Sequence, residues 1–375
     1  MTTPMFFAAQ HEGHDPTPLR QPGTHSESYY CEVPRRARLL RDALLAARLV
    51  TECVPADGGL EPLLRVHDAR MLALLQAAYE RFAVEAGAPR VVIPDTYSVG
   101  ERPRHWPRTI YGQLGWYCFD TSAPIFAGTW PAIYWSAQTA LAAAASVRDG
   151  QPVAYALCRP PGHHAHADRF GGFCYVNNAG VAADWLARQG QRVAIVDVDY
   201  HHGNGTQAIF YDRADVLFCS LHADPYDEYP YYWGHADETG VGAGRGSNLN
   251  LPLPLGCDER AYLPALRLAL DRVAQFQPDT LLISLGLDTA IGDPTGTFRL
   301  EADSFRQIGA AFADLRLPTV VIQEGGYRLD TLGAHAVAFF HGLLHPEPST
   351  INHQPPAIHH PLPTNSEGLA HEYRQ

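Results

Sequence analysis

The sequence predicts an α/β fold built on an open parallel sheet with helices on both faces. Strand-like apolar runs alternate along the chain with helix-like segments, which is the pattern of βαβ units. The run 193–199, VAIVDVD, is apolar and β-branched up to its carboxylates, as in a strand buried inside a parallel sheet. Polar residues come at the ends of four strand-like runs, at 158–164, 197–202, 286–288 and 324–327. Parallel strands bring such ends to one edge, where this class of fold binds ligands.

The expected elements follow one another in a regular order. The strand-like runs lie at 5–9, 153–158, 193–199, 216–222, 280–287 and 319–323. The segments with helical apolar spacing lie at 34–49, 68–86, 131–148, 178–189, 259–276, 303–315 and from after Tyr327 to about 344. Pro34 suits the first turn of its helix, where the missing N–H would be unpaired in any case. The aromatic-rich stretch 87–127 is expected to be irregular.

The length fits one large domain. A chain of 375 residues is long for a single domain but possible for a large α/β sheet. We expect one domain over residues 1–345, followed by a Pro- and His-rich tail over 346–375. Residues 10–33 are rich in His, Pro, Gly, Ser and Tyr and predict a long loop. Such loops in compact domains are usually functional or disordered, so both interpretations stay open here.

Composition narrows the class of protein. Hydrophobic residues make up 46% of the chain and charged residues 18%, which leaves ample material for a core. The net charge of −12 argues against a nucleic-acid surface and mildly favours cationic ligands, although it also serves solubility. The seven cysteines form no CxxC pair, as in a reduced cytoplasmic protein. No apolar run approaches membrane-spanning length, and no signal peptide is recognised. We therefore expect a cytoplasmic protein that binds neither membrane nor nucleic acid.

Metal-ligand side chains end the strand at 193–199. Side chains alternate along an extended chain, so Asp197, Asp199 and His201 share one side, and the last two can reach one ion. Carboxylate and imidazole donors suit Zn²⁺ or Fe²⁺. Asp288 follows another apolar strand and is the candidate third ligand, which would leave the open position of a catalytic site. The alternatives are an acidic strand end without a metal and an Asp288 that only caps a turn.

Three further motifs suggest catalysis. His163 and His164 stand on the rigid loop RPPGHH, where one imidazole can take a proton while its neighbour holds charge, although many adjacent histidines are merely exposed. Gly172 and Phe173, in the sequence FGGF, suggest a close wall of a narrow pocket, because glycine lets a ligand approach the backbone. Tyr327 follows EGG, where its phenol could donate to a developing oxyanion or simply pack a turn.

Together these motifs resemble a known family. RPPGHH, GGFCYVNN, VDVDYHHGNGTQ, SLGLDT with GDP, and EGGY are similar to the zinc-dependent deacetylases, which include histone deacetylases and acetylpolyamine amidohydrolases. The resemblance covers about residues 5–345. The HHGNGTQ motif, the IYGQLGWYC stretch and the loop LHADPYDEYPYYWGHADETG most resemble the bacterial acetylpolyamine branch. The resemblance implies an arginase/deacetylase-type α/β fold with about eight strands.

The resemblance also implies roles for the residues. Zn²⁺ would be held by Asp199, His201 and Asp288, with His164 as general base and then acid, His163 as its electrostatic partner and Tyr327 on the oxyanion. Asp197 would support His163, and Asn204 would pair with His164. A structural K⁺ would be bound by oxygens of Asp197, Asp199, His201, Ser220 and Leu221. The substrate tunnel would be lined by Gly172, Phe173 and Tyr229.

Two departures from the family pattern affect the interpretation. Asn204 stands where histone deacetylases have a carboxylate, and a neutral partner should raise the pKa of the His164 imidazole less. Mouth positions that are acidic in some polyamine-active members are Tyr111 and Ser122 here. The residues considered as substitutes are Glu12, Glu27, Glu32 and Asp120.

The sequence thus predicts an enzyme that removes acetyl groups from small acetylated amines, such as acetylputrescine, acetylcadaverine or other acetylpolyamines. Water attacks the amide carbonyl, and acetate leaves with the free amine as the second product. The alternatives are an acetyl-lysine protein or peptide deacetylase and an inactive binding protein of the same fold. By analogy with the polyamine branch, the 10–33 loop is expected to be an arm of a homodimer or higher homo-oligomer that narrows the mouth, unless it is a loose surface loop.

Overall fold

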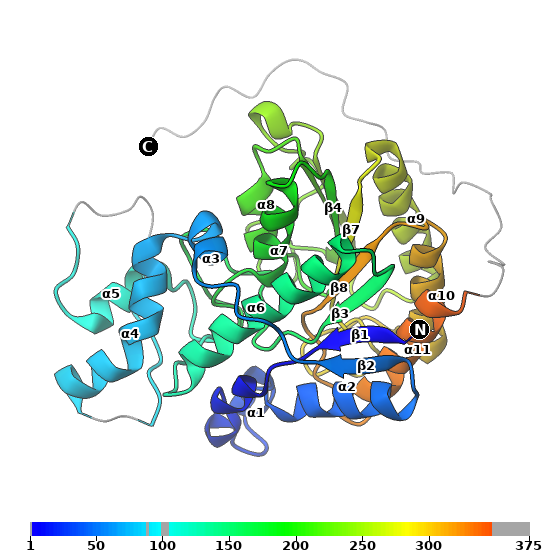
Figure 1. Ribbon diagram of the computed structural model, residues 1–375. Coiled ribbons are helices and arrows are strands. Elements are labelled where there is room, and N and C mark those ends of the chain that lie inside the picture. The colour runs from blue at the N-terminus through cyan, green and yellow to red at the C-terminus, as the bar shows by residue number, and fades with distance from the viewer. Residues whose placement is uncertain (1, 88–89, 99–104, 347–375) are drawn as a thin grey trace, which may run out of the picture.

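Eight parallel strands form one sheet in the computed structural model, which describes residues 2–87, 90–98 and 105–346 (Figure 1). In spatial order the strands are β2, β1, β3, β8, β7, β4, β5 and β6. Their bounds are β1 Thr3–Phe6, β2 Val50–Cys53, β3 Val153–Ala156, β4 Val193–Asp197, β5 Val216–Ala223, β6 Asn248–Leu253, β7 Thr280–Leu285 and β8 Thr319–Gln323. The prediction of an open parallel sheet of about eight strands is confirmed.

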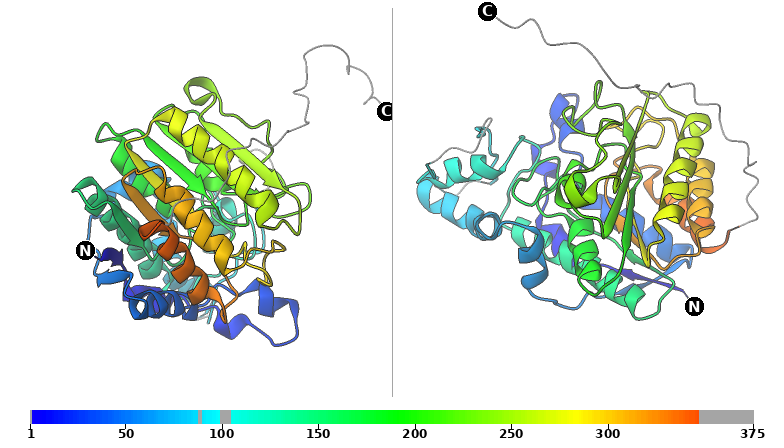
Figure 2. Two further views of the ribbon diagram at one scale, coloured as in Figure 1. Left: turned by 90° about the vertical axis from the view of Figure 1, so that its right-hand side faces the viewer. Right: turned by 90° about the horizontal axis from the view of Figure 1, so that it is seen from above.

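Helices cover both faces of the sheet (Figure 2). One layer consists of α2 Arg35–Ala46, α9 Glu259–Phe276, α10 Ala302–Ala313 and α11 Leu332–Leu344. The other layer consists of α6 Thr129–Arg148, α7 Asn178–Ala187 and α8 Asn204–Phe210. Among the described residues, no helix is both long and apolar enough to cross a membrane.

The central strand β4 shows why its sequence is continuously apolar. Ala194 and Val196 belong to the core beneath the first helix layer, whereas Val193 and Ile195 belong to the core beneath the second. All four side chains are fully buried. A parallel strand covered on both faces therefore needs apolar residues at every position rather than at every second one.

Three further helices form a lobe beside the sheet, in the left half of Figure 1. They are α3 Glu61–Val66, α4 Ala69–Ala86 and α5 Ile110–Tyr117, and they share a third hydrophobic core. The expectation that 87–127 is irregular was wrong for α5, whose first turn is capped by the Thr109 hydroxyl. The glycine-rich sequence hid this helix. Gly115 packs so closely on the Thr96 carbonyl that a Cβ would lie 1.8 Å from its oxygen, so the helix needs glycine there.

The two edge strands are not evident from the sequence. In β2 the middle residues Thr51 and Glu52 are exposed, and β6 contains two asparagines and a proline. Edge strands have fewer neighbours to bury them and fewer hydrogen bonds to make, so their sequences are less apolar. The helix α8 was also missed, because Gly203, Asn204 and Gly205 predicted a turn.

The segment 10–33 is not a plain loop. It contains most of the short 3₁₀ helix Ala9–Gly13, a second 3₁₀ helix at Thr17–Leu19 and the short helix α1 His25–Tyr29. Local hydrogen bonds hold it, including the Glu27 carboxylate accepting from the Gly23 N–H. The predicted tail at 346–375 lies outside the described residues except for Pro346.

Candidate metal centre and active site

Four neighbouring strands bring the polar strand ends together. β3, β8, β7 and β4 lie side by side in this order, and all run in the same direction. Their carboxyl ends lead to His163 and His164, to Glu324–Tyr327, to Asp288, and to Asp199 and His201, respectively. Residues that are more than 160 positions apart in the sequence therefore meet at one edge of the sheet.

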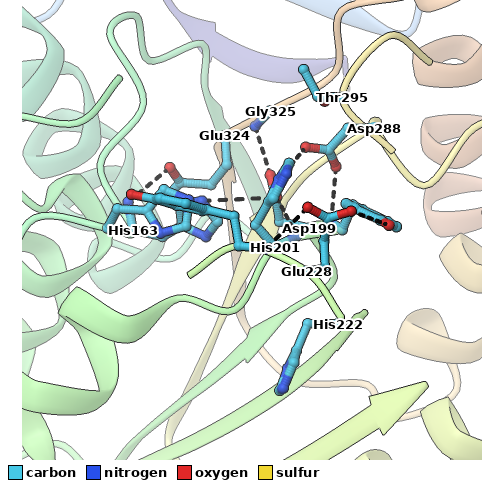
Figure 3. Close-up of polar contacts among 12 residues, drawn as sticks. His163, Asp199, His201, His222, Glu228, Asp288, Thr295, Glu324 and Gly325 are labelled. Carbon is cyan, nitrogen blue, oxygen red and sulfur yellow. Dashed lines mark hydrogen bonds and ion pairs between the residues drawn. The ribbon is translucent and has the colours of Figure 1, made fainter. Parts of the chain in front are cut away.

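Asp199, His201 and Asp288 form a compact set of donors (Figure 3). One donor atom from each lies within 4.8 Å of the other two. The Nδ1 atom of His201 is 3.3 Å from Asp199 Oδ1 and 3.3 Å from Asp288 Oδ2. Asp288 Oδ2 is buried and accepts no hydrogen bond from any described residue. Two carboxylate oxygens, one of which has no hydrogen-bond partner among the described residues, and one imidazole nitrogen are a donor set that fits Zn²⁺.

Backbone N–H groups hold one oxygen of each of these carboxylates. Asp199 Oδ2 accepts from the Gly325 N–H at 2.8 Å, and Asp288 Oδ1 accepts from the Tyr200 N–H at 2.9 Å. A Cβ at Gly325 would lie 2.3 Å from Asp288 Oδ2, so only glycine lets the turn after β8 approach both carboxylates. The remaining oxygens are held toward His201.

The two adjacent histidines have opposite electrostatic surroundings. Burial lowers the pKa of His163, but the carboxylates of Asp199 and Asp197 outweigh burial and raise it to about 10. Burial and the neighbouring charges of His163 and His201 lower the pKa of His164 well below 6.5. At neutral pH His163 is therefore a cation and His164 a neutral base, although their ring centroids are only 4.0 Å apart.

Each histidine of this pair has its own partner. His163 Nδ1 lies 3.0 Å from Asp197 Oδ2, and His164 Nδ1 lies 2.7 Å from Asn204 Oδ1. The loop that carries both is held by Glu324, whose Oε2 accepts from the Gly162 and His163 N–H groups at 2.7 and 3.1 Å. The histidine pair is buried, so it is not the exposed pair considered as an alternative.

Tyr327 lies in the same site and its ring is fixed on several sides. Its ring centroid is 4.4 Å from the Arg36 guanidinium and 5.6 Å from the Phe173 ring. Its backbone N–H donates to Asp293 Oδ2 at 2.7 Å. Arg36 also donates to the carbonyls of Gly326 and Glu324, so it braces the whole turn after β8. Burial raises the pKa of Tyr327 well above 10, which keeps the phenol protonated as a donor.

A cavity of about 430 Å³ leads to these residues. His164, His201 and Tyr327 line it together with Gly172, Phe173 and Tyr229. Asp120 joins two of the walls, because its Oδ2 accepts from the Gly172 N–H and the Tyr229 hydroxyl, both at 2.9 Å. The three residues expected to form a tunnel therefore do share one cavity. Part of its rim comes from the segment 10–33, through His25, Ser28 and Tyr29.

Of the four acidic residues considered as substitutes at the mouth, Asp120 lines the cavity and the three glutamates do not. Ser122, one of the two positions that are acidic in some polyamine-active members, lines the cavity as well. Glu12 pairs with Arg38 on the surface, and Glu32 is buried between Arg36 and Arg159. Glu27 accepts from a backbone N–H within its own segment. Tyr111 packs on Phe82 in the lobe.

Several residues of the site escaped the sequence interpretation. Glu228 lines the cavity, and its carboxylate accepts from the Tyr229 N–H and the Tyr200 hydroxyl. Arg36 and Asp293 hold the Tyr327 turn, and His166 contacts Asn204. The EGGY motif contained Glu324, but nothing local indicated that its carboxylate reaches the loop after β3. Cys174 lies beside His163 and Glu324 at a spacing that could hold a metal, yet the His163 ring nitrogens face Asp197 and Asp199 instead.

Comparison with known proteins places the chain in a family. The family model described as "Histone deacetylase domain" matches residues 30–343. Acetylpolyamine amidohydrolase 1 of Pseudomonas aeruginosa is 49% identical over 315 residues, which cover 83% of this chain and 90% of that protein. Acetylpolyamine amidohydrolase of Burkholderia pseudomallei is 44% identical over 319 residues, or 83% of this chain and 91% of that one.

Solved structures agree with these sequence matches. The crystal structure of acetylpolyamine aminohydrolase from Burkholderia pseudomallei has a TM-score of 0.85 and 41% identity, covering 91% of this chain and 98% of that one. The HDA15 HD domain has a TM-score of 0.76 and 27% identity, covering 92% and 91%. The predicted family is confirmed: the chain belongs to the histone deacetylase family and is a zinc-dependent deacetylase.

Proposed function

We propose that this enzyme hydrolyses small acetylated amines that carry a second, positively charged amine, such as acetylputrescine, acetylcadaverine or other acetylpolyamines. The cavity carries this proposal. Its lining combines the imidazole of His164 and the phenol of Tyr327 with aromatic walls and the carboxylates of Asp120 and Glu228. The relatives named acetylpolyamine amidohydrolase support the same substrate class.

In this proposal Asp199, His201 and Asp288 hold one Zn²⁺ ion. When bound, the ion acidifies a water molecule and polarises the acetamide carbonyl. The donor set is pre-arranged for a cation, because two buried carboxylates are held within reach of one imidazole by backbone N–H groups. Burial and the nearby charge of Asp199 raise the pKa of Asp288 to about 7. Its ionised carboxylate is therefore destabilised by these surroundings, and a bound cation would stabilise it.

The protein groups then divide the proton transfers between them. His164, neutral and facing the cavity, accepts a proton from the attacking water and returns it to the leaving nitrogen. His163, held as a cation by Asp197, stabilises the negative charge that develops nearby. The Tyr327 hydroxyl donates to the carbonyl oxygen as it becomes an oxyanion. Acetate and the free amine leave by the cavity.

The carboxylates of the cavity explain a preference for a cationic substrate. Every hydrogen bond that the described residues give to the carboxylates of Asp120 and Glu228 comes from a neutral N–H or O–H donor. These contacts leave both carboxylates without a cationic partner among the described residues, so a substrate ammonium can take that place. Tyr29, Tyr229 and Tyr231 line the same cavity and can contact the alkyl chain and stack on the cation.

A substrate comparison tests this proposal. Values of kcat/KM are measured for acetylputrescine, for N-butylacetamide, which has the same four-carbon chain without the ammonium, and for an acetylated histone peptide. We expect acetylputrescine to exceed N-butylacetamide by about tenfold or more, because a hydrogen bond to a charged group contributes about 1.5–3 kcal/mol. Glu228→Gln should remove most of this difference, whereas the exposed Asp149→Asn should leave it unchanged.

The outcomes distinguish the alternatives. A preference of tenfold or more for the peptide would favour an acetyl-lysine deacetylase, to which the 38% identity with the histone deacetylase-like amidohydrolase of Pseudomonas aeruginosa gives some support. Equal rates for the charged and uncharged amides would reject recognition of a cation by the cavity. An enzyme loaded with zinc that released no acetate from any of the three would indicate a binding protein.

The remaining assignments are part of the same proposal. Residues 1–345 form one catalytic domain, and the segment 10–33 is an arm of a homodimer or higher homo-oligomer, for which its place on the cavity rim is the support. K⁺ binds near Asp197, Asp199, His201, Ser220 and Leu221, where the strand register sets Ser220 beside Asp197. Fe²⁺ can replace Zn²⁺ on the same donors. The free cysteines support a cytoplasmic location.

A further inference from the structure

Asn204, the partner of His164, has a second contact on its other side. Its Oδ1 lies 2.7 Å from His164 Nδ1, and its Nδ2 lies 3.1 Å from His166 Nε2. Asn204 is buried, and its backbone is fixed at the start of α8, where the next two N–H groups donate to the His163 carbonyl. With the backbone fixed, only the rotation of the side-chain amide decides whether its oxygen or its nitrogen faces His164, and which of the two faces His166.

The orientation of this amide decides which nitrogen of His164 carries the proton. A carboxylate would present an acceptor to both neighbours, whichever way it turned. An amide presents an acceptor on one side and a donor on the other. When Oδ1 faces His164, the His164 proton is on Nδ1 and its Nε2 has a free lone pair. When the amide is reversed, the proton moves to Nε2, and His164 can no longer act as a base there.

We infer that His166 is a positioning residue: its Nε2 accepts the Asn204 amide N–H and thereby keeps His164 in the tautomer that can take a proton from water. This inference rests on the proposed role of His164 as general base. His166 acts through Asn204, at one remove from the reacting atoms. It is required because residue 204 is an amide, and a carboxylate at that position would not need it.

The surroundings of His166 suit an acceptor. Its ring is partly buried, with Trp233 at 5.6 Å and Phe119 at 6.1 Å between ring centroids. Burial lowers the pKa of His166 to about 4, so the ring is neutral at pH 7 and one nitrogen is free to accept. Other contacts hold its backbone: the His166 N–H donates to the Arg169 carbonyl, and the His166 carbonyl accepts from the His67 ring at Nδ1. A change of side chain therefore leaves these backbone contacts in place.

Two substitutions separate the acceptor from the ring. His166→Gln retains an acceptor at a similar distance from the backbone but loses the ring, whereas His166→Phe retains the ring and its packing but loses the acceptor. On acetylputrescine we expect His166→Phe to lower kcat by about tenfold or more with little change in KM, since general base catalysis contributes roughly 10²–10⁴. His166→Gln should stay within about threefold of the wild-type kcat, because its acceptor replaces Nε2.

The decisive test combines each substitution with Asn204→Asp in the zinc-loaded enzyme. A carboxylate cannot hold the wrong tautomer, so in the Asn204→Asp background the Phe and Gln variants should have nearly the same kcat. The inference is overturned if His166→Phe retains kcat while His166→Gln loses it, or if the defect of His166→Phe is equally large in the Asn204→Asp background. His166→Leu, which also lacks an acceptor, replaces His166→Phe if that variant does not fold.

The same experiment separates this inference from the proposed substrate. If the wild-type enzyme does not turn over acetylputrescine but does act on an acetyl-lysine peptide, the substrate proposal fails. The His166 variants are then measured on that peptide with the same expectations. If the wild type is active and His166→Phe is unimpaired, only the inference about His166 fails.

Discussion

Tyr327→Phe should impair the chemical step without disturbing the fold. The ring would keep its contact with the Arg36 guanidinium at 4.4 Å and with Phe173 at 5.6 Å, and its backbone would keep the bond to Asp293. The hydroxyl makes no hydrogen bond to any described residue, so stability should change by no more than about 0.5 kcal/mol. In the proposed mechanism the phenol binds the oxyanion more tightly than the neutral carbonyl, so losing this donor should lower kcat by about 10²–10³.

The assay is acetate release from acetylputrescine at saturating substrate, with zinc content and thermal melting measured on the same samples. KM should change much less than kcat. Tyr231→Phe is the matched control, because Tyr231 lines the same cavity but is 48% exposed, and it should retain kcat. A kcat of Tyr327→Phe near the wild-type value would show that this tyrosine only packs the turn after β8. A raised KM with unchanged kcat would make it a substrate-binding residue.

Two more results are expected. Asp288→Ala should lose both bound zinc and activity, as should chelator-treated wild type, whereas Asp303→Ala on the surface should lose neither; full activity in Asp288→Ala would refute the ligand set. His67 donates from Nδ1 to the His166 carbonyl and accepts the Asn177 N–H, and burial lowers its pKa to about 4 from 6.5. Its contribution to stability is complete above pH 6.5 and is lost as the pH falls toward 4, because the unfolded chain binds the proton first. When the pH falls from 7.5 to 5, the free energy of unfolding of the wild type should fall by ~2 kcal/mol more than that of His67→Gln. Urea unfolding at both pH values measures this, and equal falls in the two proteins would contradict the expectation.

The sequence by itself determined the class of fold, because that information is local. The continuous apolar run of β4 and the alternation of strands and helices depend on neighbouring residues, and they predicted a parallel sheet covered on both faces. The types and spacing of the side chains at 199 and 201 indicated metal ligands for the same reason, and Asp288 was a candidate third ligand because it follows another apolar strand. The edge strands β2 and β6 and the helix α5 were missed, since exposed or glycine-rich segments carry little of this periodic signal.

Only the tertiary structure decided how the site is built. The order β3, β8, β7, β4 cannot be deduced from the periodicity of any strand, yet it sets Asp288 beside His201 and Tyr327 beside Phe173. Arg36 reaches the turn after β8 across 290 positions of sequence, and Asn204 lies between two histidines of another loop. Such contacts depend on which distant surfaces pack together, and a single sequence records the side chains involved but not the distances between them.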